Sequence, residues 1–496
     1  MAGKISFIHT ADLHLGAPLN YGKKPPEDMA SLFNEASYSS FKWLCDRARE
    51  QEVDFLLISG DLYDREARSV KAGRVFREQC LRLREKEIQV YIIAGNHDPL
   101  GGAVEPFSLP DNVHVFSCSD VETMLFRDKE DRVLARIMGQ SYRSQFEDRS
   151  MYRYFTPQDK TVPNLGLLHT QLDPNNRHYV PVAKSDLLDK ERVDYWALGH
   201  IHQPGIVNNS QPVIVYPGTH QSRNINDRGF RGCFFVQMNE NSEPDMSFIP
   251  TAEVIYKKIV VRIGKRPASI TKTMGEETDI ERTAIEKLYG DKAGPENISD
   301  LLTPMRHLAE KMLSQVNYNK NNDSYKKSKQ NVWPELQGLP LNKEFLDEYF
   351  GKQFKGFIVR WVIEGRGPLH KIISEQNEEV AAEIITDLNK EYSGFHPFLW
   401  SHSIVFHTGH ELPEIDEFSP RNEVFQEVKR VIDELLEGEQ LEQELVSKWG
   451  KVWQGSSQPE ERAYDKFFAD SETRKDLIAE ASQRIMEELL ERSEQR

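Results

Sequence analysis

The apolar positions at the start of the chain come in short runs, which are separated by longer amphipathic stretches. Ile5–His9, Phe55–Ser59 and Val90–Ala94 are short and rich in β-branched and aromatic residues, a pattern that predicts buried strands. Between them, Leu32–Glu50 and Ser69–Lys86 carry helical patterns, and the second stretch is rich in arginine. Strands that alternate with helices favour an α/β sheet whose faces are covered.

The same β pattern continues toward residue 250. Further strands are predicted over Leu165–His169, Trp196–Leu198, Val213–Val215 and Cys233–Met238. We therefore expect a first domain over residues 1–254.

A second, smaller α/β domain is expected over residues 255–410. Its first run alternates apolar and polar positions like a strand, and the next apolar residues recur at helical spacing. The expected elements are a strand over Ile255–Ile263, a helix that contains Ile280 and Leu288, a polar loop over Tyr318–Asn331, strands over Phe357–Ile363 and Trp400–Phe406, and a helix over Glu378–Leu388.

Residues 411–496 are predicted to be helical and acidic. Two apolar stripes have helical spacing, one from Val424 to Leu436 and one from Leu477 to Leu489, and Asp470 or Ser471 is suited to cap the second helix. Such stripes usually form core or a helix pair. Docking of a partner is the second interpretation.

The charge of the chain excludes a generic nucleic-acid coat protein, which would be basic. The net charge is −16 over 496 residues. Residues 1–250 hold 29 basic and 34 acidic residues (net −5), and the rest hold 34 and 45 (net −11). Contact with DNA would thus need a local basic surface or bound metal ions.

Compartment signals in the sequence point to the cytoplasm. The N-terminus reaches Asp12 before an export signal could form, and no run approaches the roughly 20 apolar residues of a membrane helix. The four cysteines are far apart and form no pair typical of zinc or disulfide sites. We expect reduced thiols and a cytoplasmic, nucleoid-associated protein.

Five short polar motifs occur in order within the first 202 residues, and each follows a predicted strand. The carboxyl ends of neighbouring strands meet at one edge of an α/β sheet, so these side chains are expected to converge. They offer carboxylate, imidazole and amide groups but no thiolate, which suits Mn²⁺, Mg²⁺ or Fe²⁺. The motifs are Asp12-Leu-His14, Gly60-Asp61-Leu-Tyr-Asp64, Gly95-Asn96-His97-Asp98, His169, and Gly199-His200-Ile-His202.

Phosphodiester hydrolysis explains why such a set would hold two ions. The anionic ester resists attack, whereas two ions about 4 Å apart activate water, neutralise the phosphate and stabilise the leaving oxygen. A carboxylate is the natural ligand to share between the ions. An imidazole beside the leaving group can supply a proton.

The order of the motifs resembles that of the calcineurin-like metallophosphoesterases. The opening His9-Thr-Ala-Asp-Leu-His-Leu-Gly16 is similar to that of the SbcD-type DNA-repair nucleases, which include the bacterial YhaO proteins. Tyr216–Thr219 and Arg360–Gly365 also resemble segments of this group. The resemblance implies a two-layered β-sandwich flanked by helices, then a small α/β capping domain that binds DNA and a C-terminal helical region.

The resemblance also implies roles for the motif residues. His97 matches the histidine that stabilises the transition state, and Asp98 would orient it. Asp64 stands where archaeal and eukaryotic relatives carry a second catalytic histidine, which places the chain nearer the bacterial branch. The implied metal ligands are Asp12, His14, Asp61 and His202 for one ion, and Asp61, Asn96, His169 and His200 for the other.

The function implied is a Mn²⁺-dependent DNA exonuclease, with 3′→5′ action on duplex ends and endonuclease activity as further expectations. An SbcC-type coiled-coil ATPase is the expected partner, together with a homodimer. Two alternatives stay open: a phosphatase or small-nucleotide phosphodiesterase, and a scaffold with an inactive domain. Glu66 and Asp98 depart from the phosphatase pattern, and the complete ligand set argues against the scaffold.

Other polar residues are given ordinary roles. The arginine-rich helix over residues 65–84 is interpreted as a solvated face before a DNA contact, and the loop Gln221–Asn224 as a possible substrate contact. The remaining histidines are interpreted as structural or loop residues, with His220 the best placed to face the site; they are His114, His178, His220, His402, His407 and His410.

Overall fold

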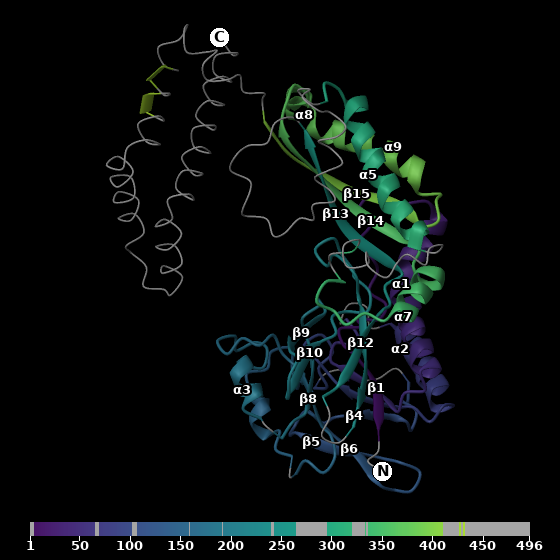
Figure 1. The fold of residues 1–496 in the computed structure, drawn as a ribbon, viewed down its shortest axis with the longest axis vertical. Helices are drawn as coiled ribbons and strands as arrows, with labels where there is room; N and C mark the ends of the chain where they lie inside the picture. The colour runs from purple at the N-terminus through teal and green to yellow at the C-terminus, as the bar shows by residue number, and fades with distance from the viewer. Residues whose placement is uncertain are drawn as a thin grey trace. The chain divides into compact units, whose positions relative to one another are not determined.

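The chain forms two compact units in a computed structural model (Figure 1). The first comprises residues 1–258, 311–360 and 389–402, and the second comprises 259–310, 361–388 and 403–496. The structure describes residues 4–64, 69–101, 107–157, 159–190, 192–239, 243–263, 295–319, 333, 336–409, 426–427 and 430–431. The division at residues 254 and 410 that the sequence suggests stays a prediction.

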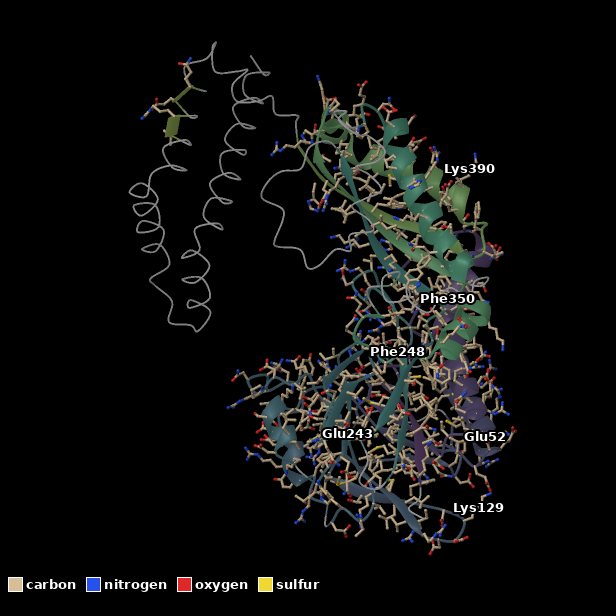
Figure 2. The ribbon with its side chains drawn as sticks, viewed as in Figure 1. Glu52, Lys129, Glu243, Phe248, Phe350 and Lys390 are labelled. Atoms are coloured by element: carbon tan, nitrogen blue, oxygen red, sulfur yellow. The ribbon has the colours of Figure 1, made fainter. Side chains whose placement is uncertain are left out.

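One sheet of the first unit carries the first three predicted strands. Its order is β12-β11-β1-β2-β3-β4, with β1 to β4 parallel and β11 antiparallel to β1. The strands are β1 (Ile5–Thr10), β2 (Phe55–Ser59), β3 (Gln89–Ile93), β4 (Val113–Val115), β11 (Gly232–Met238) and β12 (Asp245–Pro250). Figure 2 labels Phe248 on β12.

A second six-stranded sheet has the order β5-β6-β7-β8-β10-β9. Strands β6, β7, β8 and β10 are parallel, and the edge strands β5 and β9 are antiparallel to their neighbours. The strands are β5 (Glu122–Arg127), β6 (Val133–Gly139), β7 (Asn164–His169), β8 (Tyr195–Gly199), β9 (Gly205–Asn208) and β10 (Val213–Tyr216). Lys129, labelled in Figure 2, lies in the turn between β5 and β6.

The two sheets pack face to face through alternate residues of their strands. Phe7 stacks on Phe55 at 5.2 Å and meets the ring of Tyr195 edge-on at 5.4 Å. The hydroxyl of Ser59 donates to the carbonyl of Ala197 at 2.9 Å, which joins β2 to β8. The sandwich therefore has an apolar core with polar cross-links near its carboxyl edge.

Helices cover the outer faces of both sheets. On the first sheet, Ile8, Leu56 and Ile92 point away from the sandwich and pack against α1 (Glu27–Glu50) and α2 (Val70–Arg84). Ser69 caps α2 by accepting from the amide of Ala72 at 3.1 Å. On the second sheet, buried residues pack against α3 (Lys184–Leu188) and the 3₁₀ helix η1 (Met151–Tyr154).

A three-stranded sheet of order β13-β14-β15 contains the later predicted strands. The strands are β13 (Val254–Ile263), β14 (Gly356–Arg366) and β15 (Phe398–Gly409). The remaining elements are α5 (Ile298–Asn319), α7 (Lys343–Glu348), the π-helical turn η4 (Tyr349–Gln353), α8 (Leu369–Glu375) and α9 (Asn377–Tyr392).

The structure confirms the α/β fold class and every strand predicted within the described residues. Predicted helices over Leu32–Glu50, Ser69–Lys86 and Glu378–Leu388 correspond to α1, α2 and α9. Helix α5 was not predicted. The expected loop over Tyr318–Asn331 is wrong at Tyr318 and Asn319, which end α5, and residues 320–331 lie outside the described residues. The expected helix around Ile280 and the C-terminal stripes also lie outside them, apart from 426–427 and 430–431. Within the part of the chain described, no helix is long and apolar enough to cross a membrane.

Candidate metal centre

The five motifs meet at the carboxyl edge of the sandwich, entirely within the first unit. Asp12 and His14 follow β1, Asp61 and Asp64 follow β2, and residues 96–98 follow β3. From the second sheet, His169 ends β7, and His200 and His202 follow β8. Most of these side chains are buried: Asp12, His14, Asp61, Asn96 and His169 are each no more than 5% exposed.

The loops that carry the motifs have unusual backbone conformations. Asp12, His14, Asp61 and His200 have φ values of 50°, 42°, 52° and 96°, in the left-handed region that L-residues avoid. Each such residue costs about 1–3 kcal/mol unless its surroundings hold it. Backbone bonds hold these loops, because the amides of Asp12 and His14 donate to the carbonyls of Gly60 and Asp61 at 3.0 Å.

Two motif glycines allow the sheets to approach each other. A Cβ atom at Gly199 would lie 1.9 Å from the carbonyl oxygen of Ser59, and one at Gly60, where φ is 96°, would lie 2.3 Å from Nδ1 of His169. Any side chain at either position would therefore displace β8 from β2 or move His169. This explains glycine in front of Asp61 and His200 in physical terms.

Asp61 lies at the centre of the cluster. Its Oδ2 is 3.7 Å from Nε2 of His14 and 3.5 Å from Nε2 of His169. Its Oδ1 accepts a hydrogen bond of 2.9 Å from the amide of His97. One carboxylate thus touches imidazoles from two different motifs on opposite sheets.

His169, Asn96 and His200 form one side of the cluster. Nε2 of His169 and Nδ1 of His200 lie 2.9 and 3.1 Å from Oδ1 of Asn96. Nδ1 of His169 donates to the carbonyl of Ser59 at 2.9 Å, so Nε2 is the atom that faces the cluster. Adjacent ligand atoms on an octahedral ion with bonds of about 2.1 Å lie about 3 Å apart, which matches these separations.

Asp12, His14 and His202 form the other side. Each offers one ligand atom, and these atoms lie within 4.8 Å of one another. Both carboxylate oxygens of Asp12 accept from the amide of His200 at 3.0 Å. Oδ1 of Asp227 lies 3.5 Å from Nδ1 of His202 and orients that ring.

The state of His14 tests whether these residues suit a metal ion. Its imidazole is buried, yet neither ring nitrogen has a hydrogen-bond partner. A buried polar atom without a partner costs about 1–3 kcal/mol. Because Oδ2 of Asp61 is near but beyond hydrogen-bond range, a divalent cation between them would satisfy both groups, so the residues fit a metal.

Burial and charge shift the imidazole pKa values in opposite directions. Burial lowers the pKa of His169, but the carboxylates of Asp61 and Asp12 and the carbonyl of Ser59 together outweigh burial and raise this pKa to about 9. Burial, together with the neighbouring His169, lowers the pKa of His200 to about 3. The carboxylates around His169 therefore favour positive charge at this point, which a metal ion would supply in place of the proton, and the neutral imidazole of His200 can act as a ligand.

His97 stands at the exposed side of the cluster with 39% of its side chain accessible. Its Nδ1 lies 3.0 Å from Oδ1 of Asp64, and this hydrogen bond raises the pKa of His97. The same bond lowers the pKa of Asp64. Oδ2 of Asp64 forms an ion pair with Arg223, which comes from the loop after β10.

Asp98 does not occupy the position that the resemblance implies. Its Oδ2 accepts from the amides of Leu62 and Tyr63 at 2.7 and 3.2 Å, and its Oδ1 accepts from the amide of Gly95 at 2.8 Å. Asp98 therefore joins the loops after β2 and β3. The carboxylate that bonds to the ring of His97 belongs to Asp64, at 3.0 Å.

The residues given ordinary roles lie mostly away from the cluster. Nε2 of His220 bonds to the carbonyl of Ser37 at 2.8 Å, His114 stacks on Tyr91, and Nε2 of His402 lies 3.3 Å from Oδ1 of Asn20. His407 is exposed, and His410 lies outside the described residues. In α2, Arg77, Arg82 and Arg84 bond to Ser108, Asp46 and Asp111.

Asp227 and Tyr179 were missed from the sequence. Asp227 follows no strand and belongs to no motif, so nothing in its spacing links it to His202. Tyr179 contacts the ring of His200 at 4.5 Å, from a loop without periodicity. Arg223 lies in the loop Gln221–Asn224, which was singled out only for its polar donors.

The chain is similar to known phosphoesterases. Residues 5–204 match the family model of the calcineurin-like phosphoesterases. An uncharacterized metallophosphoesterase of Bacillus subtilis, YhaO, is 37% identical over 266 residues, which cover 53% of this chain and 64% of that protein.

Archaeal proteins named DNA double-strand break repair protein Mre11 also match. The protein of Archaeoglobus fulgidus is 26% identical over 43% of this chain and 50% of its own length, and that of Methanocaldococcus jannaschii is 28% identical over 51% and 68%. The chain thus spans about half to two thirds of these relatives. The matches confirm the resemblance that the five motifs predict.

Proposed function

We propose that the calcineurin-like metallophosphoesterase domain formed by residues 5–204 hydrolyses the phosphodiester bonds of DNA with two divalent metal ions. The observation that carries this proposal is the position of Asp61, whose Oδ2 lies 3.7 Å from His14 and 3.5 Å from His169. A single carboxylate between two imidazoles is what two ions with one shared ligand require.

The proposed ligand sets follow the two sides of the cluster. Asp12, His14, Asp61 and His202 hold one ion, and Asp61, Asn96, His169 and His200 hold the other. When bound, two divalent ions lower the pKa of water and neutralise the phosphate. Oxygen and nitrogen donors without thiolate favour Mn²⁺, with Mg²⁺ and Fe²⁺ as further occupants.

His97 is the proposed proton donor to the leaving oxygen. Asp64 accepts a hydrogen bond from Nδ1–H of His97, so Nε2–H points away from Asp64 and is available to the substrate. The hydrogen bond to Asp64 raises the pKa of His97, which favours the protonated imidazole that a general acid needs. Asp64 acts through His97 and is a positioning residue, and Asp98 supports the two loops between them.

DNA is the proposed substrate because the archaeal relatives are DNA double-strand break repair proteins by name. Exonuclease action from 3′ ends, endonuclease action, a coiled-coil ATPase of the SbcC type, a homodimer and a cytoplasmic location are part of the same proposal. The acidic chain needs the two cations at the site to attract a polyanion.

The proposal is tested with end-labelled duplex and single-stranded DNA, in Mn²⁺, beside Asp61→Asn. We expect degradation by the wild-type protein only, while both proteins share the same circular-dichroism spectrum and the variant binds less metal. Turnover of a phosphoprotein or cyclic nucleotide without action on DNA would support the phosphatase alternative. Wild-type protein that binds no Mn²⁺ would overturn the two-metal site.

A further inference from the structure

A series of aromatic rings leads from the surface of the first unit to the metal centre. The ring of Phe146 lies 4.9 Å from that of His178, which lies 6.3 Å from that of Tyr179. The ring of Tyr179 in turn lies 4.5 Å from that of His200, one of the proposed ligands. We call Phe146, His178 and Tyr179 the aromatic ledge.

The two loops that form the ledge are tied together by their backbones. The amide of Glu147 donates to the carbonyl of His178 at 2.9 Å, and the amide of Val180 donates to the carbonyl of Glu147 at 2.7 Å. The hydroxyl of Thr170 donates to the carbonyl of Val180 at 2.9 Å, which anchors the ledge directly after His169. These hydrogen bonds therefore fix the position of the aromatic ledge relative to the metal centre.

The ledge is open to solvent. Phe146 is 56% exposed, His178 is exposed and Tyr179 is half-buried. An exposed phenyl ring forgoes much of the stabilisation that burial of such a side chain contributes, so packing of the fold alone does not explain its place. Its contact with His178 leaves much of the ring accessible to a second planar group.

The two loops of the aromatic ledge carry equal numbers of positive and negative charges. Arg143 and Arg177 are offset in number by Asp148 and Asp173. The buried Glu147 forms an ion pair with Arg149 at 2.6 Å. General attraction of a polyanion therefore does not distinguish this surface. What it offers is flat aromatic area beside the metal centre, and nucleobases bind such area by stacking.

We propose that the aromatic ledge stacks the base of an unpaired nucleotide whose neighbouring phosphodiester lies at the metal centre. The proposal rests on the proposed nuclease function and makes its substrate more specific. Bases inside a duplex are stacked on each other and offer no free face, so the ledge selects a single strand or a frayed end. It sets the position of the strand without taking part in the chemistry.

The first test compares two single-stranded oligonucleotides of equal length, one normal and one with abasic residues on both sides of the cleaved bond. We expect the wild-type protein to prefer the normal strand about tenfold in kcat/KM, since stacking on one ring changes affinity by about that factor or more. Phe146→Ala should lose this preference, Phe146→Trp should keep it, and Phe395→Ala, at a ring 51% exposed outside the ledge, should keep it as well. An unchanged preference in Phe146→Ala would overturn the ledge.

The second test measures binding without hydrolysis. In Mn²⁺, with His97→Ala added to every protein to slow hydrolysis, a strand that carries 2-aminopurine should lose fluorescence when Phe146 or Phe146→Trp is present, but several-fold less with Phe146→Ala at equal occupancy by anisotropy. Quenching in this test, with no cleavage by the wild-type protein in Mn²⁺, would support the ledge and contradict the nuclease proposal. Cleavage without quenching, or quenching equal in Phe146→Ala, would contradict the ledge alone.

Discussion

Nδ1 of His97 lies 3.0 Å from Oδ1 of Asp64, although 33 residues separate them in the chain. Asp64 is in turn paired with Arg223, so a series of charged groups leads from the loop after β10 to the proposed proton donor. Replacement of Asp64 by Asn keeps the shape and removes the charge. We expect kcat to fall about 10- to 100-fold, less than the roughly 100- to 10,000-fold contribution of general acid catalysis because His97 itself remains, with little change in KM.

The pH profile separates this role from a merely structural one. The hydrogen bond to Asp64 raises the pKa of His97, and His97 acts in its protonated form. Asp64→Asn should therefore move the alkaline limb of the kcat profile to lower pH. A uniform loss of activity at all pH values, with the limb in place, would speak for a structural defect.

Metal content should follow the division of ligands between the two sides of the cluster. His14→Ala removes a ligand of one proposed ion only, whereas Asp61→Asn weakens the ligand shared by both. Elemental analysis after dialysis against Mn²⁺ should find about two ions in the wild type, about one in His14→Ala and fewer than one in Asp61→Asn. Equal content in all three proteins would contradict the shared ligand.

Chelation should lower the stability of the wild-type protein. A ligand present at 100 times its dissociation constant stabilises the folded state by about 2.7 kcal/mol. EDTA should thus lower the melting temperature of the wild type by several degrees and that of Asp61→Asn by much less, as measured by calorimetry. The same shift of melting temperature in both proteins would mean that EDTA does not act by removing metal ions that Asp61 binds.

Asp98 should matter for stability more than for the ionisation of His97. Its carboxylate accepts from three backbone amides, and Asp98→Ala leaves buried donors unpaired at about 1–3 kcal/mol each. We expect the free energy of unfolding, measured in urea, to be at least about 2 kcal/mol lower than that of the wild type. Unchanged stability with a large loss of kcat would restore the orienting role that the resemblance implies.

Glu253 should make the fold less stable at alkaline pH. Burial raises the pKa of this carboxyl from 4.5 to about 7. A raised folded pKa means that its contribution is fully present below pH 4.5 and is lost as the pH rises through 7. Glu253→Gln should match the wild type in urea at pH 5 and exceed it at pH 8.5, and the reverse order would contradict this assignment.

The strands that carry the site were predictable because their signal is local. β2, for example, is a run of five apolar or small residues that ends directly before Gly60 and Asp61, and the structure has it over the predicted range. The same locality explains why α2 was recognised from its sequence pattern; that Ser69 caps it is seen in the structure. Short-range patterns thus placed the motifs at strand ends.

The missed features depend on contacts between distant segments or on conflicting local signals. Helix α5 contains Pro304, which argues against a helix in any local reading. β5 is an edge strand without a buried residue, and its three apolar residues stand between charged and polar ones, without the longer apolar run of a core strand. Asp64 lies in the loop after β2, whereas Arg223 and Asp227 lie in the loop after β10, and only the folded chain brings them to His97 and His202.

The carbonyl of Ser59 touches both sheets: it accepts from His169 and lies where any side chain at Gly199 would fall. The five motifs therefore depend on the strands that carry them and could not form the site on their own. Grafted onto another sandwich with the correct spacing, they would lack the strand whose backbone supports them, and a designer would have to transplant β2 and β8 together with the loops.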